Sequence, residues 1–223
     1  MRLDSPGAAQ AREQQEQLRA LENSIPPPIV PDPANQVLAR LAEAEAGRWQ
    51  AWWQLTYYLM LTPKSRALAY DLNYFITTMP GWAEADDELR RRITVSAERY
   101  LTDAETSTDA WLGHNPMPIQ MNDVAGLRAF ILLKQVSPEG YARIADETWR
   151  KWAPVIVGLP RRTVIDKSPE IAAILADALS GAPVEFVAAV RTIIRLERER
   201  LRAPGFTPQP GPPFFILLRD LEG

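Results

Sequence analysis

The sequence contains no cysteine and only one histidine, His114. Without thiols the chain has neither a disulfide framework nor a thiolate metal site, which is typical of proteins in a reducing compartment. A single histidine also excludes the metal sites that are built from two or three histidines. We therefore expect no bound metal ion, and we predict that the protein resides in the cytoplasm.

Long apolar runs and glycine-rich loops are also missing. No apolar stretch approaches the roughly 20 residues that a membrane-spanning helix needs, and the N-terminal residues are polar, so neither a membrane span nor a signal peptide is expected. The 11 glycines are isolated, and neither Gly-x-x-x-x-Gly-Lys-Ser/Thr nor Gly-x-Gly-x-x-Gly occurs. A phosphate cradle needs consecutive free amides. The sequence thus predicts no nucleotide cofactor and no enzymatic activity.

What the chain does have is a short pattern that occurs three times, Ser/Thr-Pro-x-x-x-Ala-x-x-x-Asp. Ser or Thr caps the first turn of a helix, and Pro is well tolerated at the first helical position. Each copy therefore predicts a helix start, and recurring starts indicate stacked helical hairpins. The copies begin at Thr62-Pro63, Ser137-Pro138 and Ser168-Pro169.

Apolar residues recur with helical spacing, and no segment alternates strictly, so we predict an all-α fold. We expect an α-solenoid of stacked hairpins, similar to HEAT or TPR arrays, with about eight or nine helices. The expected helices are 36–45, 48–61, a segment after Pro63 that carries Phe75 and Ile76, 86–101, one capped by Asp123, one from Ser137 to Trp152, one from Ser168, and one from Pro183 to about Arg202.

The 20 prolines collect between these helices and toward both ends. Their distribution predicts four regions. These are a polar N-terminal helix or arm (1–24), a Pro-rich linker (25–33), the helical repeat domain (34–202), and a Pro/Gly-rich linker with a truncated apolar segment (203–223).

Four arginines on the last helix, Arg191, Arg195, Arg198 and Arg202, fall at i, i+4, i+7 and i+11 and form one ridge. Such a ridge could bind phosphate or an acidic partner. The alternative is an ordinary solvated face, which the nearby acids and the net charge of −3 favour. Further candidate contacts lie in or beside loops. They are Trp82, Trp111, His114, Arg161 and Arg162.

Tryptophan and proline landmarks follow one another in order along residues 35–223. They include Ala51-Trp52-Trp53-Gln54-Leu55, Leu61-Thr62-Pro63, Met79-Pro80-Gly81-Trp82, Asp109-Ala110-Trp111-Leu112-Gly113, Trp149-Arg150-Lys151-Trp152-Ala153-Pro154 and Phe215-Ile216-Leu217. This ordered set resembles a helical region of bacterial STAND-type (NACHT-like) NTPases of antiphage defence. The chain has no NTPase module, so the resemblance implies only the sensor-like helical array and no catalytic residue. The apolar run 214–218 is what we expect of an array cut from a longer one.

Three hypotheses follow. The first is a non-catalytic helical-repeat module that binds a protein, either a phage protein or a separate NTPase subunit. The second is a nucleic-acid-binding module that uses the arginine ridge, and the third is a helical enzyme built around His114. A fragment of a larger protein with no function of its own is the remaining alternative. We expect the first.

Overall fold

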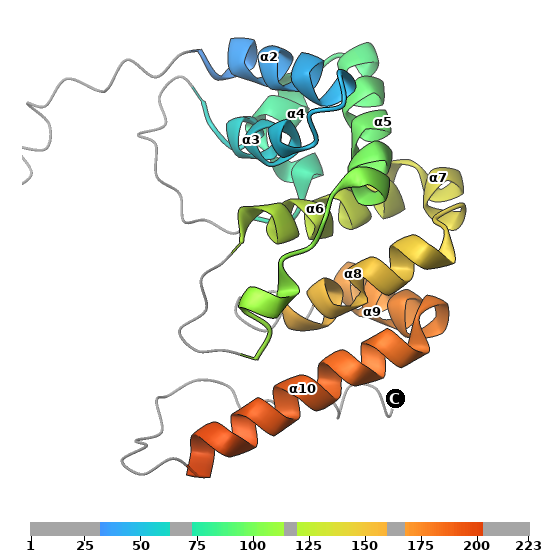
Figure 1. Cartoon of the computed structure of the whole chain (residues 1–223). Coiled ribbons are helices and arrows are strands. Elements are labelled where there is room, and N and C mark those ends of the chain that lie inside the picture. Colours follow the sequence, from blue (N-terminus) through green and yellow to red (C-terminus); the bar gives the residue numbers. More distant parts are fainter. Residues whose placement is uncertain (1–31, 63–72, 114–119, 160–167, 203–223) are drawn as a thin grey trace, which may run out of the picture.

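The computed structural model describes residues 32–62, 73–113, 120–159 and 168–202, and within these ranges the protein is entirely α-helical and has no strand (Figure 1). This confirms the all-α class. The helices are α2 (Pro33–Glu45), α3 (Gln50–Leu59), α4 (Pro80–Glu84), α5 (Asp87–Asp103), α6 (Met121–Val136), α7 (Pro138–Ala142), α8 (Asp146–Gly158), α9 (Pro169–Gly181) and α10 (Pro183–Arg202), with 3-10 turns η1 (Ile76–Thr78) and η2 (Thr108–Ala110).

Helices α2 and α3 form an antiparallel hairpin. The side chain of Asp32 accepts a hydrogen bond from the Ala34 amide at 3.2 Å, and Pro33 occupies the first helical position. The last two residues of the predicted linker therefore belong to the start of α2. Gly47, at a φ of 86°, makes the turn between the helices, as expected of a glycine that ends a helix.

Helix α6 lies at the centre of the molecule. Its residues from Asp123 to Leu133 are all buried, and α3, α5, α7, α8 and α9 pack around it. Figure 1 shows α2 and α3 on one side of α6 and α8, α9 and α10 on the other. In a solenoid each repeat contacts only its neighbours. The structure does not confirm the predicted solenoid, because a helix that is apolar on all sides is enclosed by several others.

The second and third copies of the repeated pattern lie at helix starts, but the helices that follow them differ in length and capping. Ser168 caps α9 as predicted, since its Oγ accepts a hydrogen bond from the Ile171 amide. Ser137 precedes α7, but its side chain makes no capping bond. The chain breaks after Ala142, so the single helix predicted from Ser137 to Trp152 is wrong and is replaced by α7 and α8. Most of the first copy lies outside the described residues.

The segment before α5 also differs from the prediction. Phe75 has an extended backbone and Ile76 belongs to the 3-10 turn η1, so neither lies on an α-helix. The side chain of Asn73 explains this locally, because its Oδ1 accepts a hydrogen bond from the Phe75 amide, an Asx turn that competes with helix. Pro80-Gly81-Trp82 begins the short helix α4, which the sequence analysis did not predict.

Buried aromatic rings join the two sides of the core. The ring of Tyr100 on α5 lies 5.9 Å from the rings of both Trp52 and Trp152. The indole of Trp52 donates to the Ala125 carbonyl at 3.1 Å, and that of Trp152 donates to the Leu101 carbonyl at 2.9 Å. These bonds satisfy the polar atoms of large apolar side chains, as buried tryptophans require.

Candidate functional site

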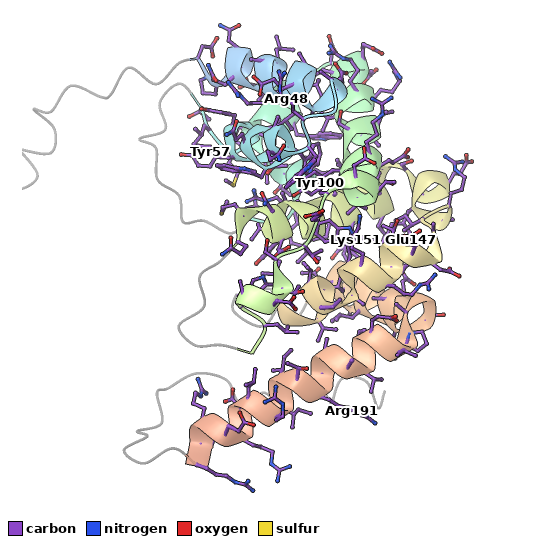
Figure 2. All side chains as sticks on the ribbon, viewed as in Figure 1. Arg48, Tyr57, Tyr100, Glu147, Lys151 and Arg191 are labelled. Carbon is purple, nitrogen blue, oxygen red and sulfur yellow. The ribbon has the colours of Figure 1, made fainter. Side chains whose placement is uncertain are left out.

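The outer side of α10 carries a continuous exposed stripe. Helix α10 packs against α8 and α9 through the opposite side, where Phe186, Ala189 and Ile193 are buried. Figure 2 shows Arg191 pointing away from those helices. We call the exposed line of side chains the α10 stripe. It consists of Val184, Val187, Arg191, Arg195, Arg198 and Arg202.

The α10 stripe has an apolar end and a basic end. Val184 is 74% exposed and Val187 is 40% exposed. The spacing of i, i+3, i+7, i+11, i+14 and i+18 keeps all six side chains on one face over about 27 Å of helix. The structure confirms that the four predicted arginines form one solvent-facing ridge.

Acidic residues neutralise part of this ridge. Arg195 pairs with Glu199 at 3.1 Å, one turn along the helix. Glu197 pairs with Arg200, which is half-buried and lies toward the inner side of α10. For Arg191, Arg198 and Arg202, no ion pair is formed within the described part of the chain. They are the available charges of the stripe.

Two of the other predicted contact residues, Trp82 and Trp111, are not part of this surface. Trp82 and Trp111 are buried, so they belong to the core and are not exposed to a partner. Their place next to loops suggested exposure. However, Trp111, which directly follows η2, packs against Gly158 of α8, and the Arg90 guanidinium lies 5.9 Å from the centroid of the Trp82 ring. His114, Arg161 and Arg162 lie outside the described residues.

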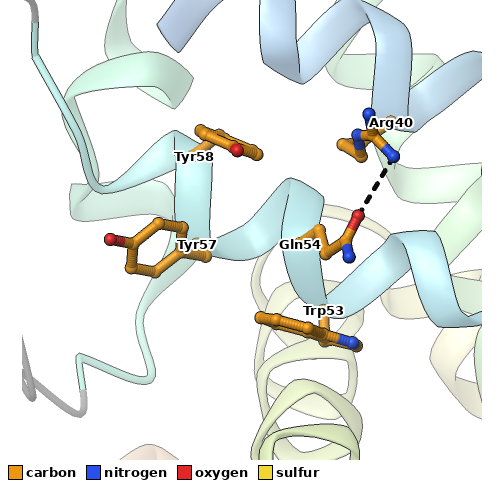
Figure 3. A pocket seen from close by; sticks show the side chains of 5 residues that line it. All are labelled: Arg40, Trp53, Gln54, Tyr57 and Tyr58. Atoms are coloured by element: carbon orange, nitrogen blue, oxygen red, sulfur yellow. Dashed lines mark hydrogen bonds between the residues drawn. The ribbon is translucent and has the colours of Figure 1, made fainter. Parts of the chain in front are cut away.

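A second surface feature is an aromatic groove on the α2–α3 hairpin, which the sequence reasoning missed. It has a volume of about 370 Å³, and we call it the α3 groove (Figure 3). Arg40 lies across from the α3 side chains and donates to the Gln54 amide oxygen at 3.1 Å. The lining residues are Arg40, Trp53, Gln54, Tyr57 and Tyr58.

The sequence of α3 is apolar on nearly all sides, a pattern typical of a helix buried between neighbours. In fact Trp52 and Leu55 are buried, whereas Trp53, Tyr57 and Tyr58 are only half-buried. The missed signal is the i, i+4 pair of Trp53 and Tyr57, whose polar atoms suit a half-exposed position. Only the packing of α2 against the other side of α3 reveals which aromatics remain accessible.

Buried polar groups elsewhere are engaged in holding segments together. Asp123 accepts hydrogen bonds from the Ser107 amide and from the Trp111 indole. Burial raises the pKa of the Asp123 carboxyl, and these two donors oppose the rise. Asp123 was predicted to cap α6, but the residue at the cap is Gln120, which makes no side-chain bond.

Two other clusters of polar side chains connect helices to neighbouring segments. Arg128 on α6 donates to the Asn73 carbonyl at 2.8 Å and to the Thr56 hydroxyl at 3.0 Å. Asp177 on α9 accepts from Lys134 and from the Tyr141 hydroxyl. Burial, followed by the bond to Asp177, raises the pKa of Tyr141.

Within the described residues, no three histidine, aspartate or glutamate side chains gather in a way that could hold a metal ion. None of the described helices is by itself long and apolar enough to cross a membrane; α9 and α10 meet that test only as a pair, and a 116° bend separates them.

No protein-family model, curated protein or solved structure matches the chain.

Proposed function

We propose that this chain is a non-catalytic helical domain that binds another protein through the α10 stripe. The observation that carries the proposal is the line of six exposed side chains, two valines followed by four arginines, on the outer face of the last described helix. Arginine is enriched at protein interfaces and among the residues that contribute most to binding, and the two exposed valines add apolar contact area beside the arginines. The expected partner presents an acidic rim beside an apolar patch.

Two further observations support a binding role. The buried side chains of Asp123 and Arg128 and the half-buried side chain of Asp177 are engaged with the protein's own backbone and side chains, as structural residues are. The arginines of the stripe, by contrast, are exposed to solvent. They keep their side-chain freedom in the free protein, and charge-assisted hydrogen bonds to a partner would offset the loss of that freedom on binding.

The sequence resemblance suggests which kind of protein this is. We propose a sensor-like helical array of the kind attached to bacterial STAND-type NTPases, acting in the cytoplasm and binding a phage protein or a separate NTPase subunit. Neither a repeat architecture nor a defence role follows from the fold, so both depend on identifying the partner.

The test is an affinity capture from host lysate, with and without phage infection, using two charge variants. Arg191→Glu with Arg198→Glu reverses two available charges of the α10 stripe. Arg143→Glu with Arg150→Glu makes the same change in net charge at exposed positions outside the stripe. We expect a stoichiometric partner that the first variant loses and the control retains, and direct binding of the purified partner with the same ranking.

Equal loss in both variants would indicate a net-charge effect and would contradict the stripe as the contact surface. A catalytic turnover that survives removal of contaminants would contradict the non-catalytic role.

A second candidate function is nucleic-acid binding, favoured by the four exposed arginines at helical spacing. It predicts that binding to duplex or single-stranded DNA weakens steeply between about 50 mM and about 200 mM salt, with a slope near one counterion per phosphate contact. The exposed valines and the Arg195–Glu199 pair favour a protein over a polyanion. Fluorescence anisotropy with labelled oligonucleotides decides between nucleic-acid binding and protein binding. If the protein binds no oligonucleotide at low salt, nucleic-acid binding is excluded.

A further inference from the structure

The α3 groove has unused hydrogen-bond donors beside flat aromatic surfaces. Within the described part of the chain, the Trp53 indole nitrogen and the Tyr57 and Tyr58 hydroxyls make no hydrogen bond. Arg40 uses only its Nη1 atom, which donates to Glu43 and Gln54. Figure 3 shows the Tyr58 and Tyr57 rings on one side, the Trp53 ring on another, and Arg40 facing Gln54 across the opening.

This combination matches the chemistry of a proline-rich segment. A polyproline II chain has no internal hydrogen bonds, so its carbonyls are free acceptors, and its pyrrolidine rings pack on flat aromatic side chains. Grooves that bind such segments are lined by aromatic residues with a few donors. The volume of about 370 Å³ also falls within the usual range of ligand-binding pockets.

The same chain carries such a segment directly before α2 in the sequence. Residues 25–31 read Ile-Pro-Pro-Pro-Ile-Val-Pro and end directly before Asp32, the cap of α2. Arg40 lies eight residues after Asp32 on that helix, which corresponds to about 12 Å along its axis. Seven residues in polyproline II conformation span about 22 Å. The segment is therefore long enough to turn back at Asp32 and to reach along the groove.

We propose that the α3 groove binds the Ile25–Pro31 segment of its own chain. The rings of Trp53, Tyr57 and Tyr58 receive the prolines, and the Trp53, tyrosine and Arg40 donors bind the backbone carbonyls. The segment precedes α2, whereas the α10 stripe lies at the other end of the molecule (Figure 1), so this site is independent of the proposed partner surface.

The absence of cysteine makes a spectroscopic test direct, because one introduced thiol is the only one in the chain. A nitroxide label on Ile29→Cys of the full chain is expected to broaden the NMR amide signals of Tyr57 and Tyr58. Leu38 provides the matched control, since it is exposed on α2, closer in sequence to the label, and does not line the groove. Selective broadening at the two tyrosines supports the proposal, and equal or stronger broadening at Leu38 overturns it.

Disulfide trapping tests the same contact chemically. In the full chain, Ile29→Cys with Gln54→Cys should oxidise about tenfold faster than Ile29→Cys with Leu38→Cys, because docking raises the effective concentration of the first pair. Replacing Pro27 and Pro28 by serine should remove that advantage and should also remove the selective broadening. Unchanged rates after the proline replacement would contradict recognition of the proline-rich segment.

Mixing labelled chains with isotope-enriched unlabelled chains separates this proposal from its nearest rival. Broadening that appears only within the labelled chain supports an intramolecular contact. Broadening between chains would show that a second copy supplies the segment and would overturn the proposal.

Discussion

The Asp123 carboxylate accepts a hydrogen bond from the Trp111 indole at 2.6 Å, which ties the segment after α5 to the first turn of α6. The same carboxylate accepts from the Ser107 amide at 3.1 Å. Asp123 is completely buried, and the first turn of α6 supplies a favourable helix-dipole environment for its negative charge. One side chain thus holds both ends of the η2 turn against the central helix.

Removing the Asp123 carboxylate should lower the stability of the folded protein. Asp123→Ala leaves the buried Trp111 and Ser107 donors without an acceptor, and we expect a loss of about 3 kcal/mol in the free energy of unfolding. Asp123→Asn should cost only about 1 kcal/mol. The reason is that the oxygen that accepts from Trp111 also lies 3.3 Å from the Ser107 amide, so a single amide oxygen there serves both donors. Urea unfolding measures both variants, and equal losses would contradict this account.

The pH dependence of stability should report the buried state of Asp123. Burial raises the pKa of Asp123 in the folded protein above its ordinary value of 3.8. A raised pKa means that the folded state holds the proton more tightly, so this contribution to stability is complete below about pH 4 and declines as the pH rises through the folded pKa. The difference in unfolding free energy between wild type and Asp123→Asn should fall over that interval and then become constant. A difference that rises with pH would contradict the direction of the shift.

Gly126 permits the closest approach in the core. A Cβ atom at this position would lie 1.9 Å from Cζ3 of Trp152. Trp152 is pinned by its hydrogen bond to the Leu101 carbonyl and has no space to withdraw. We expect Gly126→Ala to destabilise the protein by about 3 kcal/mol, despite the better helix propensity of alanine.

Gly47→Ala is the matched control, because an added Cβ there meets nothing within 4 Å and only the φ of 86° opposes it. That substitution should cost about 1–2 kcal/mol. Thermal unfolding followed by circular dichroism compares the two variants, and a larger loss at Gly47 would refute the packing argument.

The bidentate pair between Glu45 on α2 and Arg92 on α5 should contribute modestly to stability. The Arg92 Nε and Nη2 atoms donate to the two Glu45 oxygens at 2.8 and 2.7 Å. The hydrogen bond from Arg92 lowers the pKa of Glu45, so the contribution is present above its ordinary pKa and is lost as the pH falls through the lowered value. Both side chains remain about one third exposed, so Glu45→Gln should cost only about 0.5–1 kcal/mol and less in high salt. Chemical denaturation of the wild type and of Glu45→Gln at low and high salt measures both the loss of stability and its salt dependence.

The charge reversals in the α10 stripe should leave the fold intact. Arg191 and Arg198 are exposed and form no ion pair within the described residues, so their replacement by glutamate should change the unfolding free energy by no more than about 0.5 kcal/mol. A cooperative unfolding transition close to that of wild type would assign any loss of partner binding to the surface itself. A large destabilisation would show that these arginines support the fold.

Local sequence patterns predicted those helices that bury one face and expose the other. The stripe of Ile93, Ala97 and Tyr100 located α5, and the alternation of Phe186 and Ile193 with exposed arginines located α10 and its ridge. Prediction was wrong where a side chain competes with the helical backbone, as Asn73 does before η1, and where a break depends on packing, as between α7 and α8.

The sequence by itself determined the all-α class, the capped start of α9 and the arginine ridge, because helix propensity, capping and helical periodicity act over a few residues. Tertiary structure alone decided that α6 is central, that Trp111 is buried on Asp123 and that Trp53 and Tyr57 line a groove. Each of these depends on which surfaces meet across tens of residues of chain. Apolar burial favours many such arrangements almost equally, and the fit of particular side chains selects one of them.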